Sequence, residues 1–245
     1  MRKRDRRVRN IPVSQIIPNM ITSGSVFCGV SSLIMTYRGN LIPAAVLIFF
    51  AVFFDVMDGR VARSLGGSSS FGEELDSLAD AISFGVAPAF LMYVAYVDYT
   101  GSVPGVLAAS FFALCGVLRL ARFNVTHVPA GPFQGLPIPA GGLTLAACVM
   151  ARVPLTPLIA ITLMCFIGGL MVSSVPYCNA KKLKKGNVNR AKLYAIMGFV
   201  VLCFVLLREK AFLAVSIVYI VSGLIRFDAA AWVMEDEEDP IHEKD

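Results

Sequence analysis

The chain has 245 residues, of which 56% are hydrophobic and only 16% are charged, and its mean hydropathy is +0.70. Soluble domains carry about 25% charged residues, so this composition excludes an ordinary soluble fold and predicts a polytopic, all-α membrane bundle. The net charge of +5 is uneven, because residues 1–10 hold six Arg and Lys while residues 235–245 are acidic. In so apolar a chain, a basic segment favours the membrane surface as its partner and not nucleic acid.

The apolar segments predict about eight transmembrane helices, since a helix needs roughly 20 apolar residues to cross the hydrocarbon layer. In chain order the predicted segments are 18–37, 41–64, 72–97, 103–125, 138–152, 155–175, 191–207 and 211–234. The fifth is short for a span, which indicates a tilted helix or one that begins deeper in the protein. We predict a basic membrane-surface segment at 1–17, one membrane domain at 18–234 and an acidic, disordered tail at 235–245.

Four acidic residues lie where the second segment ends and the third begins. Asp55 and Asp58 are three residues apart, and Asp76 and Asp80 are four apart. On helices both spacings put the two side chains on one face. The serine- and glycine-rich stretch 64–72 between the pairs has turn chemistry. We therefore expect a helical hairpin that presents all four carboxylates to one point.

Four carboxylates at one point near a membrane repel one another unless cations neutralise them. Oxygen ligands at this density suit Mg²⁺, Mn²⁺ or Ca²⁺, and four are enough for two ions, the arrangement that clamps a phosphoryl group. Gly59 and Ala62 are small enough to let a ligand approach the backbone, and Arg63 adds a cationic fork for phosphate. A cation transporter also needs intramembrane acids, but along a path and not clustered at one side.

The pattern D-x-x-D-G-x-x-A-R, eight residues, G-x-x-x-D-x-x-x-D resembles the signature of the CDP-alcohol phosphatidyltransferase family. It is met without departure at Asp55, Asp58, Gly59, Ala62, Arg63, Gly72, Asp76 and Asp80. The resemblance implies a membrane enzyme that transfers a phosphatidyl group from CDP-diacylglycerol to an alcohol and releases CMP. It also implies two divalent cations, Mg²⁺ or Mn²⁺, on the four aspartates, a nucleotide close to Gly59, Ala62, Arg63 and Gly72, and Asp80 as the base.

Other stretches resemble the branch of this family whose acceptor alcohol is L-serine. They are the R-x-A-R-F-N run at 119–124, the F-x-G-L-P-I-P-A run at 133–140 and the S-S-V-P-Y run at 173–177, to which we assign no role. Gly141 and Gly142 depart slightly from the alanine-rich continuation usual there. Arg119, Arg122 and Asn124 are candidates for acceptor binding, although the two arginines equally suit ordinary membrane-surface anchors.

The sequence does not exclude glycerol 3-phosphate or an inositol phosphate as the acceptor. Either one would need extra cationic ligands for its phosphate. Arg119, Arg122 and the lysine run at 181–185 could supply them. Asn19 and Thr22 open the first apolar segment as a P-N-x-x-T run, which resembles the family's first helix beside the nucleotide, although both residues also suit ordinary helix caps.

Orientation follows from the basic residues, which gather at the same predicted side as the four aspartates. The positive-inside rule makes this side cytoplasmic, with both termini and the active site there. We therefore expect an integral protein of the cytoplasmic membrane, and the resemblance implies a homodimer.

Overall fold

The computed structural model describes residues 13–66, 69–98, 102–126, 133–177, 194, 198 and 205–225. These residues form mostly helices, which confirms the predicted class. The helices are α1 (Val13–Tyr37), α2 (Leu41–Ser64), α3 (Ser70–Asp80), the π-helix η1 (Ala81–Val86), α4 (Ala87–Tyr96), α5 (Val103–Thr126), α6 (Ile138–Met150), α7 (Pro157–Val172), the 3₁₀-helix η4 (Arg208–Lys210) and α9 (Ala211–Leu224). Two short strands, β1 (Phe133–Gln134) and β2 (Pro176–Tyr177), pair antiparallel, with Phe133 opposite Tyr177.

Within the described residues, four helical stretches are long and apolar enough to cross a membrane: 16–37, 41–64, 70–96 and 103–125. They match the first four predicted segments to within a few residues. Helices α6 and α7 have only 13 and 16 residues, so the predicted count of eight spans is not confirmed. The lysine run, the acidic tail, residues 1–12 and most of the seventh predicted segment lie outside the described ranges.

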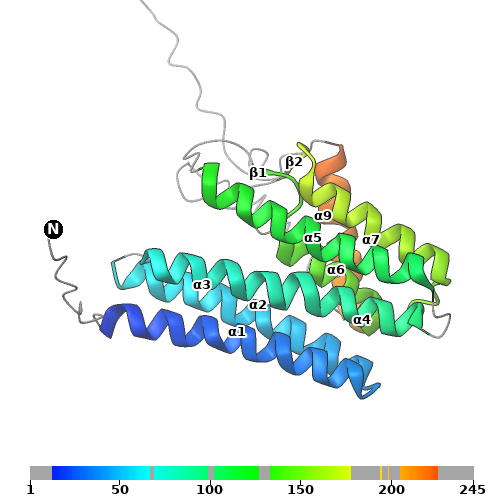
Figure 1. The fold of residues 1–245 in the computed structure, drawn as a ribbon, viewed down its shortest axis with the longest axis horizontal. Coiled ribbons are helices and arrows are strands. Elements are labelled where there is room, and N and C mark those ends of the chain that lie inside the picture. The colour runs from blue at the N-terminus through cyan, green and yellow to red at the C-terminus, as the bar shows by residue number, and fades with distance from the viewer. Residues whose placement is uncertain are drawn as a thin grey trace, which may run out of the picture.

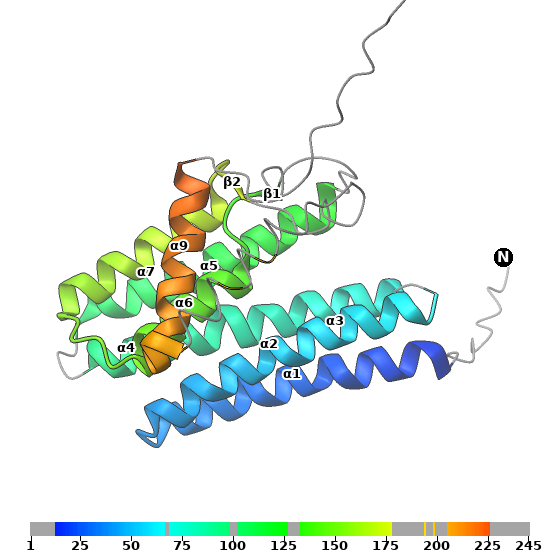
Figure 2. The same ribbon diagram turned by 180° about the vertical axis from the view of Figure 1, so that it is seen from behind.

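The helices form two groups that meet at an angle. Helices α1, α2 and the continuous α3–η1–α4 line run side by side, while α5 and α7 pair above them (Figure 1). Helix α6 lies between the groups, where it contacts α2, α4, η1 and α9 and is buried over most of its length. From behind, α9 crosses α6 and covers it (Figure 2).

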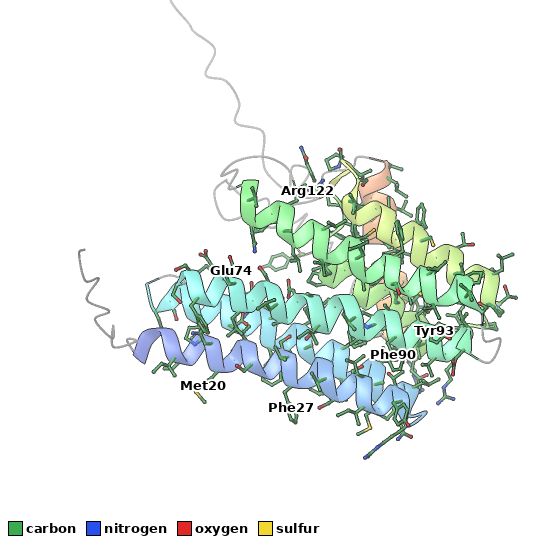
Figure 3. All side chains as sticks on the ribbon, in the orientation of Figure 1. Met20, Phe27, Glu74, Phe90, Tyr93 and Arg122 are labelled. Carbon is green, nitrogen blue, oxygen red and sulfur yellow. The ribbon has the colours of Figure 1, made fainter. Side chains whose placement is uncertain are left out.

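Large apolar side chains point outward from this bundle, as a lipid environment requires. Met20 and Phe27 project from α1 away from its neighbours and are 69% and 73% exposed (Figure 3). Inside, α2 presents the small residues Ala44, Ala45 and Ala51, all fully buried. Lipid tails are as apolar as the protein interior, so close packing of small residues, and not the hydrophobic effect, selects the inner face.

Helix α1 begins earlier than predicted. Its first residue is Val13, and Pro18, which we expected at the start, lies inside it. The boundary predicted at residue 17 therefore falls within α1. Thr22 Oγ1 donates a hydrogen bond to the Pro18 carbonyl at 3.1 Å. The stretch that we predicted to open the first segment is therefore a polar turn within α1.

The π-helix η1 follows directly after Asp80, and π-helical turns are frequent at functional sites. It is held from α1 through Ser83, whose Oγ donates to the Ser25 carbonyl at 2.9 Å. Gly29 allows this approach, because a Cβ added there would lie 2.6 Å from Ser83 Oγ. This contact fixes the backbone that carries Asp80.

Candidate active site

The predicted hairpin brings three of the four aspartates together. Asp55 comes from α2, and Asp76 and Asp80 come from α3. One carboxylate oxygen from each lies within 4.8 Å of the others. Asp55 of α2 and the four-residue pair of α3 therefore meet at one point, while the three-residue pair on α2 contributes only Asp55 to it.

Asp58 lies beside this group and not within it. It is only 6% exposed, and its Oδ2 has no hydrogen-bond partner among the described residues. It nevertheless interacts electrostatically with Asp55, Asp76 and Asp80. A buried carboxylate oxygen without a partner is costly, so this arrangement fits a bound cation. With only oxygen donors present, the set suits a hard divalent ion such as Mg²⁺ or Mn²⁺.

Helix α1 borders the acidic group through the two polar residues that the sequence singled out. Thr22 is 3% exposed and lies against Asp58. Asn19 lies against the start of α3, since a Cβ added at Gly72 would be 3.0 Å from Asn19 Oδ1. Gly72 also donates its N–H to Ser69 Oγ at 3.1 Å, the N-cap of α3. The missing side chain at Gly72 therefore leaves room for Asn19 of α1 at the start of α3.

The remaining motif residues of α2 are Gly59, which directly follows Asp58, and Ala62 and Arg63, about one turn further along. Arg63 is exposed, and its guanidinium folds back over Gly59, with Nη1 3.7 Å from the position of an added Cβ. Ala62 is buried at the contact with the neighbouring helices. An added Cβ at 59 would make only ordinary van der Waals contact with the Arg63 guanidinium, so packing within the chain does not itself require glycine there.

The sequence matches the family described as CDP-alcohol phosphatidyltransferase over residues 15–224. The chain belongs to the CDP-alcohol phosphatidyltransferase family. It is therefore a transferase, and its apolar helices make it an integral membrane protein.

Similar proteins from distant bacteria carry one name. A CDP-diacylglycerol–serine O-phosphatidyltransferase of Helicobacter pylori is 34% identical over 221 residues, which covers 86% of this chain and 91% of the relative. An enzyme of Bacillus subtilis with the same name is 36% identical over 176 residues, which covers 72% of this chain and 97% of the relative. Among solved structures, the apo form of Mycobacterium tuberculosis phosphatidylinositol phosphate synthase is 22% identical with a TM-score of 0.48, covering 66% of this chain and 90% of that one.

In this member of the CDP-alcohol phosphatidyltransferase family, the three predicted acceptor residues have different surroundings. Arg119 on α5 is 7% exposed, its Nε has no hydrogen-bond partner in the described part of the chain, and its charge interacts with Asp80. Arg122 Nη1 and Nη2 donate to the carbonyls of Val172 and Gln134 at 3.1 and 2.8 Å.

Asn124 completes the α5 set with a contact to the helix that carries Asp76. Its Nδ2 donates to Ser77 Oγ at 3.1 Å, and Ser77 directly follows Asp76 in α3. Of the three predicted acceptor residues, Arg119 is the one whose charge interacts with Asp80, while Arg122 and Asn124 form hydrogen bonds to other parts of the protein.

Sequence reasoning missed two residues on the far side of Arg119. Tyr219 on α9 interacts with Arg119, and its ring centroid lies 5.5 Å from that of Tyr177 on β2. Tyr177 is 3% exposed, and its hydroxyl has no partner among the described residues. The S-S-V-P-Y run at 173–177 was the only sequence feature that pointed to Tyr177. A sequence does not show that the phenol of this residue is buried.

Proposed function

We propose that this enzyme transfers the phosphatidyl group of CDP-diacylglycerol to the hydroxyl of L-serine and releases CMP. The observation that carries the proposal is the convergence of Asp55, Asp76 and Asp80 to within 4.8 Å, with Asp58 beside them, in the family's motif. The names of the relatives from Helicobacter pylori and Bacillus subtilis support serine as the acceptor.

Two divalent cations, Mg²⁺ or Mn²⁺, would be held by Asp55, Asp58, Asp76 and Asp80. When bound, such ions offset the negative charge on the diphosphate and on the departing CMP. Arg63 lies one turn further along α2 and is exposed, so its guanidinium can bind phosphate oxygens. Thr22 and Asn19 on α1 border the acidic group and are in position to meet the nucleotide.

The reaction forms one phosphorus–oxygen bond and breaks another. The serine hydroxyl oxygen bonds to the phosphatidyl phosphorus, the bond from that phosphorus to CMP breaks, and CMP leaves with the electron pair. Asp80 takes the proton of the serine hydroxyl, which alone is a weak nucleophile near pH 7. Of the aspartates at the site, Asp80 is the one whose charge interacts with buried Arg119. The proposed base therefore lies near a cation that can bind the acceptor.

Among the described residues, the cations of α5 favour a carboxylate acceptor over a phosphorylated one. A phosphate dianion calls for several cationic ligands. Arg122 donates through both terminal nitrogens to backbone carbonyls, so on α5 a single buried guanidinium, that of Arg119, faces the aspartates. One guanidinium matches one carboxylate.

We further propose that the acidic end of the bundle is cytoplasmic and that two chains associate. Arg60, Arg63, Arg119 and Arg122 lie toward this end of the helices, while Arg38, Arg152, Arg208 and Lys210 lie at the other. The excess that the sequence assigns to the acidic end therefore comes from the basic residues of 1–10 and 181–192, which are outside the described ranges. Excess positive charge marks the cytoplasmic side. On that side, soluble serine can reach the head group of the nucleotide-activated lipid. Homodimers are expected from the family resemblance.

An acceptor panel tests the proposal. The purified protein in detergent, with CDP-diacylglycerol and Mn²⁺, is supplied separately with labelled L-serine, glycerol 3-phosphate and inositol 1-phosphate, and lipid product and CMP are measured. We expect serine alone to yield a labelled lipid, with one CMP released per lipid formed. Incorporation of glycerol 3-phosphate or inositol phosphate in its place would refute serine as the acceptor. No transfer to any of the three acceptors, together with ion flux after reconstitution into vesicles, would refute the enzyme class.

A further inference from the structure

We infer that Tyr177 and Arg119 together form the subsite that binds the α-carboxylate of the amino-acid acceptor, with Tyr177 as a specificity-determining residue. This inference rests on the proposed function, because it concerns how serine lies in the same site. It assigns a role to the S-S-V-P-Y run, whose residues contribute nothing to the cation site.

Two buried polar groups in this region have unmet hydrogen bonds. Arg119 is 7% exposed and Tyr177 is 3% exposed, and neither the Arg119 Nε nor the Tyr177 hydroxyl has a partner within the described residues. Leaving a buried donor unsatisfied costs about 1–3 kcal/mol, and more for a charged group. Two such donors in one region indicate a ligand that accepts from both.

The two groups lie in one region, because Tyr219 packs on Tyr177 and interacts electrostatically with Arg119. The Tyr219 ring centroid is 5.5 Å from that of Tyr177, and the Tyr219 hydroxyl interacts with the charge of Arg119. Tyr177 is fixed from behind by α9, where its ring packs directly on Gly223, so that any side chain at 223 would overlap it. The phenol is therefore held rigidly.

Backbone contacts hold this region on the correct side of α5. Arg122 is one turn beyond Arg119 on the same face of α5, and it donates to the carbonyl of Gln134 on β1. Gln134 pairs with Pro176, the neighbour of Tyr177 on β2. The β1–β2 pair thus places Tyr177 near the turn of α5 that carries Arg119.

A carboxylate group matches these donors. Binding of the serine carboxylate here would also direct the serine hydroxyl toward Asp80. Arg119 supplies a cationic fork and Tyr177 supplies one O–H, both of which donate to carboxylate oxygens. Burial raises the pKa of the Tyr177 phenol above its ordinary value, so the group remains a donor at neutral pH. Since Arg119 also interacts with Asp80, a serine anchored here by its carboxylate has its hydroxyl on the side of the acidic group.

The test compares L-serine with L-serinamide, which keeps the hydroxyl and the amine but replaces the carboxylate by a neutral amide. The variant is Tyr177→Phe, which removes one oxygen and keeps the ring on Gly223. A hydrogen bond to a charged group corresponds to roughly a 10- to 100-fold change in affinity. We therefore expect Tyr177→Phe to lower kcat/KM for L-serine about tenfold or more through KM, to leave serinamide within about twofold, and to leave KM for CDP-diacylglycerol unchanged.

Matched variants separate this role from a structural one. Tyr37→Phe removes the same atom from an 84% exposed tyrosine at the end of α1 and should leave both substrates unchanged. Arg119→Gln should abolish the preference of the wild type for serine over serinamide, even if it lowers the total yield of folded protein. A loss by Tyr177→Phe that is equal for both substrates, or no loss, would overturn the subsite while serine transfer by the wild type still stands.

The wild-type enzyme tests the carboxylate subsite and the proposed function separately. If it uses L-serine but accepts L-serinamide equally well, the carboxylate subsite is wrong and the proposed function holds. If it transfers to another alcohol and not to serine, the proposed function fails and the subsite fails with it.

Discussion

The backbone of Gly142 on α6 lies directly against that of Phe84 in the π-helix η1. A Cβ added at Gly142 would be 2.6 Å from the Phe84 carbonyl oxygen and 3.0 Å from its Cα. The glycine that departs from an alanine-rich pattern is thus required here, because α6 touches the segment that follows Asp80. With Gly29 on the α1 side, two glycines hold η1 between two helices and set the position of the turn that carries Asp80.

Gly142→Ala should therefore be destabilising and should reduce transfer. Overpacking against backbone costs about 1–3 kcal/mol, because a carbonyl cannot move aside as a flexible side chain can. Thermal unfolding in detergent and the rate of serine transfer measure the two effects. Gly169→Ala on α7 is the matched control, since an added Cβ meets nothing within 4 Å there, and it should be neutral or slightly stabilising. Equal behaviour of the two variants would contradict the packing argument.

Asp80→Asn should abolish transfer while the protein still folds and inserts. An amide cannot accept the hydroxyl proton, and loss of general-base catalysis costs about 10²- to 10⁴-fold. In the absence of divalent cations the variant should unfold at the same temperature as the wild type or a higher one, because one of several repelling carboxylates is removed. The measurements are incorporation of labelled serine and thermal unfolding with a chelator present. Near-normal turnover would refute Asp80 as the base.

Arg122→Gln should lower stability more than it changes serine binding. The arginine donates to the Val172 carbonyl at the end of α7 and to the Gln134 carbonyl of β1, and each such bond to a charged donor contributes about 1.5–3 kcal/mol when buried, less at this partly exposed site. We expect a clear drop in Tm with KM for serine changed less than about threefold. Arg38→Gln, at an exposed position of the other end, should leave both unchanged. An unchanged Tm with a large rise in KM would restore Arg122 as an acceptor ligand.

Ser77 and Asn124 should show a coupling energy in a double-mutant cycle. Their side chains are hydrogen-bonded between α3 and α5 at 3.1 Å, and a neutral hydrogen bond contributes about 0.5–1.5 kcal/mol. The unfolding free energies of Ser77→Ala, Asn124→Ala and the double variant give the coupling directly. Additive effects of the two substitutions would mean that this bond does not hold α5 against the helix that carries Asp76.

The positions of the long helices and of the acidic group were predictable because they depend on local patterns. Apolar length gave the first four segments, and the Gly/Ser stretch between two acid pairs gave the hairpin, since spacing on a helix decides which side chains share a face. The spacing gave four converging carboxylates, whereas the structure has three within 4.8 Å and Asp58 beside them. The difference arises because the angle between α2 and α3 depends on packing against α1 and not on either helix alone.

The acceptor side of the site was less predictable because it depends on contacts between residues far apart in the chain. Arg119 and Arg122 look alike in the R-x-A-R run, yet one is buried without a hydrogen-bond partner in the described residues and the other donates to two carbonyls. Tyr177 reaches this region only through pairing of β1 with β2. The π-helix was also invisible, since nothing in Ala81–Val86 distinguishes it from an α-helix by apolar pattern.

We propose that Asp55, Asp58, Asp76 and Asp80 bind the two divalent cations on which transfer depends. The direct measurement is a Mn²⁺ titration, followed by electron paramagnetic resonance, of the detergent-purified wild type, Asp76→Asn and Glu74→Gln, an exposed acid on the same helix (Figure 3), each with serine transfer assayed in parallel. We predict that Asp76→Asn loses Mn²⁺ affinity and transfer together, by about 100-fold or more, while Glu74→Gln retains both. Wild-type Mn²⁺ binding by Asp76→Asn, or full transfer by the wild type in excess chelator, would contradict the account.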